Sequence, residues 1–197
     1  MNSTLLRHTL AAAAALAALY ILAGNVNAFR DYQIAQIAAL SCAAAGLTLL
    51  TGRSGQISLG QGAFMAIGAY TAALLLDHLS WPLAAVIGAA ALAAAGVGLI
   101  VGIAAARLRG PYLAGATLAF AVGLPQLADY HPLTGSLGGA NGLTLPPLTA
   151  PAGLGDAFPV ERWQAWLAGG VAVVVFWLLA YLAAGETGRR FAAVRDD

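Results

Sequence analysis

The residues that could carry chemistry gather between positions 52 and 62, where the chain reads G-R-S-G-Q-I-S-L-G-Q-G. Ser54 is a candidate serine nucleophile, and such a nucleophile needs a base within hydrogen-bond reach. The neutral side chains of Ser54, Gln56, Ser58 and Gln61 supply hydrogen-bonding groups without fixed charge. Two kinds of chemistry are therefore open for this stretch, namely covalent catalysis at serine and the binding of a solute.

Covalent catalysis at Ser54 is not expected, because no histidine is placed to act as its base. Residues 52–55 match the G-x-S-G pattern of rhomboid-type intramembrane serine proteases, but His8 precedes the first apolar run, His78 ends the third, and His131 lies in a long loop. About 30 Å of bilayer separates the two ends of a spanning helix. We therefore predict no catalytic residue. A chain without lysine also cannot form the G-x-x-x-x-G-K-[ST] phosphate loop, so any ATP is bound by another polypeptide.

Glycines at positions 52, 55, 60 and 62 predict a break in the backbone, because each costs about 1 kcal/mol inside a helix relative to alanine. Irregular backbone at membrane depth is tolerated only where it is buried in protein or lines a polar cavity. Transporters bind substrate at such interruptions. A tight turn followed by a small-residue packing face is the alternative, and the spacing alone leaves it open.

Composition places the chain in a membrane. Hydrophobic residues make up 60% and charged residues 9% of the sequence, whereas a soluble domain carries about 25% charge. The net charge of +1 gives no reason to expect nucleic acid as a partner. The single cysteine, Cys42, allows neither an internal disulfide nor a cysteine-based metal cluster, and we predict no metal and no cofactor.

Long uncharged runs predict the membrane-spanning helices, since about 20 apolar residues cross the hydrocarbon. The six runs cover residues 9–24, 32–52, 54–76, 79–106, 110–128 and 163–184. The first could instead be a signal peptide cleaved near Ala28, although an uncleaved helix is the default. The predicted fold is an all-α integral membrane protein, a polytopic helix bundle with about six transmembrane helices and a broken glycine-rich segment.

The arginines predict an orientation by the positive-inside rule. One side receives Arg7, Arg53, Arg107, Arg109, Arg189, Arg190 and Arg195, and the other receives Arg30 and Arg162. Both termini are therefore expected in the cytoplasm. The middles of the runs contain no ionisable residue, which argues against a proton relay.

Two segments outside the runs also invite a role. Residues 129–162 form a long proline-rich loop on the predicted outer side, which is either a docking surface for an extracytoplasmic partner or a plain connector. Residues 185–197 are expected to form a short cytoplasmic helix with a mixed basic and apolar face. Simple charge anchoring at the membrane edge is the alternative reading of this tail.

Four segments together resemble one family. They are L-T-L-L-T-G-R-S-G-Q-I-S-L-G-Q-G-A-F-M-A-I-G-A-Y-T-A-A-L-L at 47–75, R-L-R-G-P-Y-L-A-G-A-T-L-A-F at 107–120, G-G-A-N-G-L at 138–143 and G-R-R-F-A-A-V-R-D-D at 188–197. In this order they resemble the LivM-type permease subunits of bacterial branched-chain amino-acid ABC transporters. The resemblance runs from about residue 32 to the end of the chain.

The resemblance implies one permease domain over residues 1–197, multi-pass in the bacterial inner membrane and surrounded by lipid. It implies an importer with a second, H-type permease subunit, two ATP-binding subunits and a periplasmic substrate-binding protein, so that this chain transports rather than catalyses. The residues implied to line the substrate path are Gly52, Ser54, Gly55, Gln56, Ser58, Gly60 and Gln61. Those implied to begin the ATPase-coupling loop are Gly188, Arg189, Arg190 and Arg195.

The chain departs from this family in two ways. Position 53 is commonly aromatic or apolar in relatives, whereas Arg53 is charged. Family members also continue past this length, so the chain looks truncated. If these 197 residues are the whole product, we expect that the chain cannot transport alone, and its coupling to an ATPase is left open. The substrate could also be urea, a short amide or an aromatic acid, and a non-transporting membrane remnant or scaffold is the alternative from another functional class.

Overall fold

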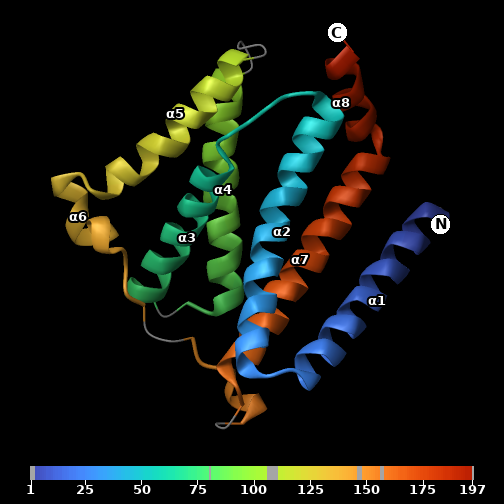
Figure 1. Cartoon of the computed structure of the whole chain (residues 1–197), viewed down its shortest axis with the longest axis vertical. Coiled ribbons are helices and arrows are strands. Elements are labelled where there is room, and N and C mark those ends of the chain that lie inside the picture. The colour runs from blue at the N-terminus through green and yellow to red at the C-terminus, as the bar shows by residue number, and fades with distance from the viewer. Residues whose placement is uncertain (1–2, 80, 106–110, 146–147, 156–157, 197) are drawn as a thin grey trace. The chain divides into compact units, whose positions relative to one another are not determined.

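The computed structural model describes residues 3–79, 81–105, 111–145, 148–155 and 158–196 and is helical over most of them (Figure 1). No β-strand occurs in these described residues. The chain divides into two compact units, the first made of Met1–Gly55 with Leu148–Asp197 and the second of Gln56–Pro147. The predicted class, an all-α polytopic membrane protein, is confirmed.

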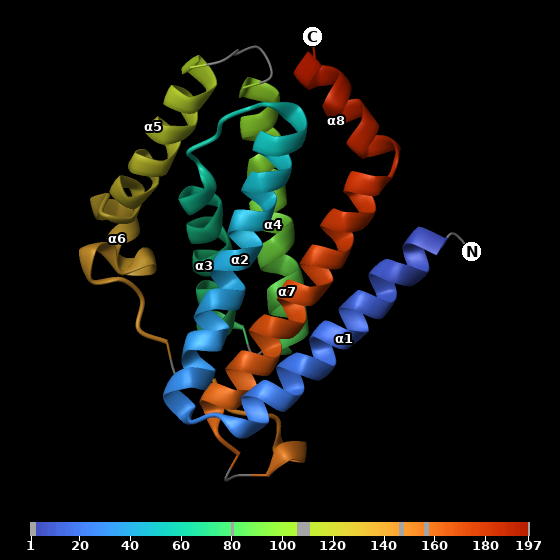
Figure 2. The same cartoon turned by 45° about the vertical axis from the view of Figure 1, so that its right-hand side comes forward.

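The first unit is built around one long helix. It comprises α1 (Ser3–Asn25), α2 (Ala28–Ser54), η2 (Ala152–Leu154), α7 (Val160–Ala184) and α8 (Glu186–Asp196). Helix α7 packs against α1, α2 and α8, and α8 also contacts α2 (Figure 2). Gly169 of α7 is buried, and a Cβ there would overlap the side chain of Leu19, so the glycine lets α1 approach α7 closely.

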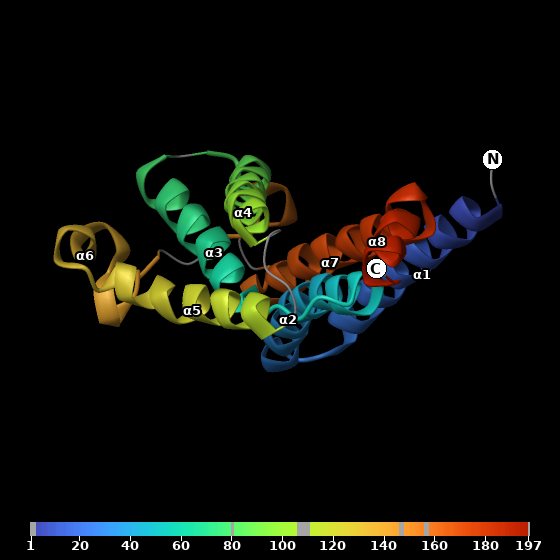
Figure 3. The ribbon, with the colours of Figure 1, turned by 90° about the horizontal axis from the view of Figure 1, so that it is seen from above.

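The second unit places one helix between two others. It comprises α3 (Gln61–His78), α4 (Leu83–Ala105), α5 (Pro111–Ala128), α6 (His131–Leu137) and η1 (Gly139–Asn141). Helix α3 packs against both α4 and α5 (Figure 3). The rings of Phe64 on α3 and Phe120 on α5 lie 5.5 Å apart between their centroids. A Cβ on Gly98 of α4 would meet Phe64 at 3.8 Å, so these three residues tie the helices together.

Some of the six expected membrane-spanning helices are long and apolar enough to cross a membrane. Four helices in the described residues qualify: Leu6–Asn25, Ala28–Ser54, Leu83–Ala105 and Val160–Ala184. Tyr112–Ala128 is a shorter apolar helix. Helix α3 has only 18 residues, with polar Gln61, Asp77 and His78 at its ends. Crossings by α3 and α5 therefore remain predictions.

Several boundaries differ from those expected from uncharged runs. Helix α2 begins at Ala28 rather than 32, because the side chain of Asn27 accepts a hydrogen bond from the Arg30 amide at 3.0 Å and caps the helix. Helix α7 begins at Val160 rather than 163, directly after Pro159. First turns tolerate charge, so an uncharged run underestimates a helix at this end.

The long loop is also more ordered than a plain connector. Between residues 129 and 162 it contains α6 and both 3₁₀ turns, η1 and η2. Gly138, with φ 76°, ends α6 in the left-handed conformation that favours glycine. Arg107, Arg109, Pro146 and Pro147 lie outside the described residues. A role of this loop in docking stays a prediction.

Candidate functional site

The glycine-rich segment is broken, as its composition predicted. Helix α2 ends at Ser54, Gly55 adopts φ 68°, and the Gly55 amide donates to the Thr51 carbonyl at 3.1 Å. Regular helix resumes only at Gln61, so the expected run from residue 54 is not helical at the six positions 55–60. The physical reason is the left-handed backbone at Gly55, which an L side chain would oppose.

Within the first unit, the start of the glycine-rich segment forms the C-terminal end of α2. Ser54 is buried, and its hydroxyl donates to the Leu50 carbonyl at 2.6 Å. This bond satisfies the serine inside its own helix. Gly52 is exposed and lines a groove along α2. Of the predicted path residues in this unit, Gly55 fixes the direction of the chain as it leaves the helix.

Within the second unit, a side chain that sequence analysis missed holds the segment. Thr117 of α5 is 4% exposed, and its Oγ1 accepts a hydrogen bond from the Leu59 amide at 2.9 Å. The same hydroxyl can donate to the Leu113 carbonyl at 2.9 Å. Thr117 thus connects the non-helical backbone to the regular helix α5.

Gly60 permits this close approach. It is buried, and a Cβ at this position would come within 3.3 Å of the Thr117 Cβ. The Gly60 amide donates to the Ser58 hydroxyl at 3.4 Å, and Ser58 is 9% exposed. The structure therefore brings Ser58 and Gly60 together against α5.

The two glutamines of the segment are less enclosed. Gln56 and Gln61 are both partly exposed, and Gln61 begins α3. Gly60 occupies the N-cap of α3 and has no side chain with which to satisfy the first amides of the helix. These amides and the positive end of the helix dipole therefore border the broken segment.

The C-terminal tail forms the helix that was predicted. Gly188 of α8 is buried, and a Cβ there would overlap the carbonyl oxygen of Ala183 near the end of α7, so only glycine permits this helix-to-helix angle. Arg189 and Arg190 are exposed. Arg190 pairs with Glu186 at 3.8 Å, a surface contact of small energetic value. Arg195 lies in α8, and its side chain is outside the described ones.

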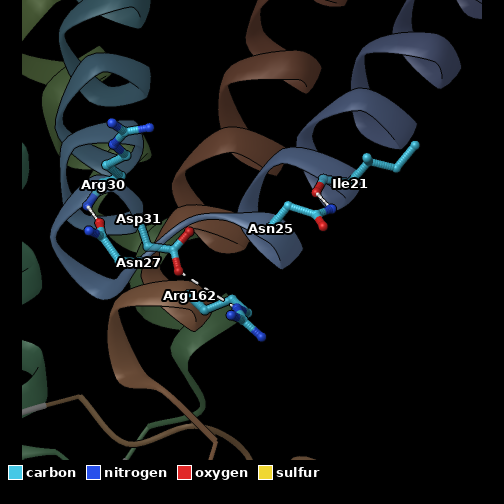
Figure 4. A network of polar contacts seen from close by, with 6 residues as sticks. All are labelled: Ile21, Asn25, Asn27, Arg30, Asp31 and Arg162. Carbon is cyan, nitrogen blue, oxygen red and sulfur yellow. Dashed lines mark hydrogen bonds and ion pairs between the residues drawn. The ribbon is translucent and has the colours of Figure 1, made fainter.

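A partly buried ion pair, in which the Arg162 side chain is 27% exposed, joins α2 to α7 in the first unit (Figure 4). Asp31, 1% exposed, points from the first turn of α2 toward Arg162 in the first turn of α7, with 3.6 Å between Oδ2 and Nε. Neither carboxylate oxygen accepts a hydrogen bond from the described residues. Arg162 also lies 6.0 Å from the centroid of the Phe158 ring. The two opposite charges therefore lie together at the neighbouring N-termini of α2 and α7.

Comparisons with known proteins define the class of this chain. A family profile described as "Branched-chain amino acid transport system / permease component" matches residues 29–197. The chain belongs to this family of transport permeases. Among the described residues, no group of three His, Cys, Asp or Glu side chains is placed to hold a metal ion.

The similar curated proteins are of the LivM type. The chain is 45% identical over 75 residues to the high-affinity branched-chain amino acid transport system permease protein LivM of Escherichia coli K12. It is 44% identical over the same length to LivM of Salmonella typhimurium LT2. Each alignment covers 38% of this chain and 18% of the relative, so the chain matches about a fifth of their length. No solved structure matches the chain significantly.

Proposed function

We propose that the chain serves as a permease subunit of an ABC importer for branched-chain amino acids. The observation that carries this proposal is the non-helical segment 55–60, held against α5 by the bond between Leu59 and Thr117, in a chain whose family is transport permeases. Irregular backbone at membrane depth is tolerated where it is buried in protein or lines a polar cavity. A solute path supplies one.

The proposed path is lined or shaped by the predicted segment. It comprises Gly52, Ser54, Gly55, Gln56, Ser58, Gly60 and Gln61. The Ala63 amide donates to the Gly60 carbonyl at 3.0 Å. The amides of Gln61 and Gly62 before it suit a substrate carboxylate, as discontinuous helices do in other transporters. Backbone carbonyls suit the ammonium group of the same molecule. A zwitterion with an apolar side chain therefore needs no fixed countercharge here.

Energy for the cycle is proposed to come from other subunits. The assembly would contain an H-type permease, two ATP-binding subunits and a periplasmic substrate-binding protein, with both termini of this chain in the cytoplasm. Helix α8 is the proposed contact with the ATP-binding subunits, through Gly188, Arg189, Arg190 and Arg195. Its contacts with both α2 and α7 offer a mechanical link from that surface to spanning helices.

Reconstitution tests this function. Vesicles that contain the chain with all four partner subunits should accumulate radiolabelled leucine when ATP is enclosed, and a non-hydrolysable ATP analogue should abolish accumulation. Vesicles that lack this chain serve as the control. Equal leucine accumulation with and without the chain would refute the proposal, as would uptake of urea but not leucine.

A further inference from the structure

The first unit has an open groove of about 610 Å³ along α2 and α7. Its α2 wall is formed largely by small residues, including Ala44, Ala45 and Gly52, and its α7 wall includes Phe176 and Leu179. Both helices are long and apolar enough to cross a membrane. The groove therefore lies on spanning helices that lipid can reach.

The hydroxyl groups in the groove do not make it polar. Ser41 donates to the Ala38 carbonyl at 2.7 Å, and Thr48 donates to the Ala44 carbonyl at 2.7 Å. Both donors are satisfied within α2. What these side chains present to the groove is mostly carbon, which suits a hydrocarbon chain.

One charge marks one end of the groove. Arg53 lines it in the last turn of α2, and its side chain is exposed. Among the side chains that the structure describes, no carboxylate pairs with Arg53. The proposed transport function assigns this arginine no role.

Helix α8 adds positive charge near the same end. The groove reaches Ala183 of α7, the penultimate residue of that helix, and α8 follows directly while contacting α2. Arg189 and Arg190 on α8 are exposed. Arg190 is paired with Glu186, so among the described side chains Arg53 and Arg189 supply the unpaired positive charge near this end. An apolar groove that ends beside these arginines is complementary to an amphiphile with one apolar chain region and one anionic head.

We propose that this groove binds an anionic phospholipid, with an acyl chain along α2 and α7 and the headgroup phosphate at Arg53. Guanidinium and phosphate pair through two parallel hydrogen bonds, which a neutral side chain cannot replace. A transmembrane helix of a partner subunit fits this charge pattern less well, because it would have to bring its own anion to the membrane edge beside Arg53.

Native mass spectrometry tests the proposal on the chain purified in mild detergent with the partners that it retains. Phosphatidylglycerol and phosphatidylcholine with the same acyl chains are the probes. We expect phosphatidylglycerol to bind more tightly, and Arg53→Gln to lower its affinity about fivefold, the effect of one basic residue at a membrane surface. Arg30→Gln, at the opposite end of the same helix and also exposed, should leave the affinity unchanged.

Two further measurements distinguish a phospholipid from free phosphate and identify what occupies the groove. Inorganic phosphate should not displace the lipid, because it cannot fill the apolar groove, and Ala44→Phe should weaken both lipids by filling it. Equal binding of the two lipids, equal effects of Arg53→Gln and Arg30→Gln, or a partner helix cross-linked into the groove would overturn the proposal. None of these outcomes depends on transport, so the test stands apart from the proposed function.

Discussion

Replacing Arg162 with methionine should lower the free energy of unfolding by less than the roughly 3–5 kcal/mol that breaking a fully buried ion pair costs, because the Arg162 side chain is 27% exposed. Asp31 is 1% exposed and sits 3.6 Å from the Arg162 Nε, so this substitution strands a carboxylate between α2 and α7. Unfolding by denaturant in detergent micelles measures the change. The effect should exceed that of any surface substitution.

Two variants give this prediction its controls. Arg30→Met removes an exposed arginine next to Asp31 and should change the unfolding free energy by less than about 0.5 kcal/mol. The double variant Asp31→Val with Arg162→Met removes both charges and should regain most of the stability. If Arg162→Met costs no more than Arg30→Met, the ion pair does not stabilise the contact between these helices.

Replacing Thr117 with valine should destabilise the second unit by about 1 kcal/mol, the net contribution of one part-buried hydrogen bond. The shape of the side chain is kept, but the Leu59 amide loses its partner at 2.9 Å. Hydrogen exchange of the peptide that contains residues 55–62 should become faster. In the assembled transporter, the loss of order in residues 55–62 should lower the maximal rate of leucine uptake.

Thr117→Ser provides the matched control, because serine keeps the hydroxyl that accepts from Leu59 and donates to Leu113. Its exchange rate at residues 55–62 should stay close to that of the unchanged protein. Equal exchange in the valine and serine variants would show that the hydroxyl does not hold the segment. Faster hydrogen exchange at residues 55–62 without a change in leucine uptake would show that the order of this segment does not control transport.

Local signals in the sequence were sufficient for the broken segment and for α8. The glycines at 52–62 predict a break because helix propensity is a local property, and Gly55 does end α2 with φ 68°. The buried Gly188 belongs to a motif that the family resemblance had already identified. Membrane character followed from hydropathy alone.

Contacts between residues that are far apart in the sequence could not be predicted from the sequence. Asp31 and Arg162 looked like two charges outside uncharged runs, and their pairing requires that α2 and α7 lie side by side with their N-termini together. Thr117 was one hydroxyl in an apolar segment, and its partner Leu59 is 58 positions away. Helix starts were misplaced for a related reason, since caps and first turns accept charge that a hydropathy run rejects.

The central claim is that the broken segment borders a water-accessible solute path, and cysteine accessibility tests it most directly. With Cys42 replaced by serine, Gln61→Cys supplies one thiol at the start of α3, and Leu92→Cys supplies a control on α4 at a side chain that is 75% exposed on an apolar spanning helix. In the assembled transporter, a membrane-impermeant maleimide applied to both faces should label position 61, more slowly when leucine-loaded binding protein is present, and should leave position 92 unlabelled. Failure to label position 61, or labelling at both positions that ignores leucine, would contradict the account.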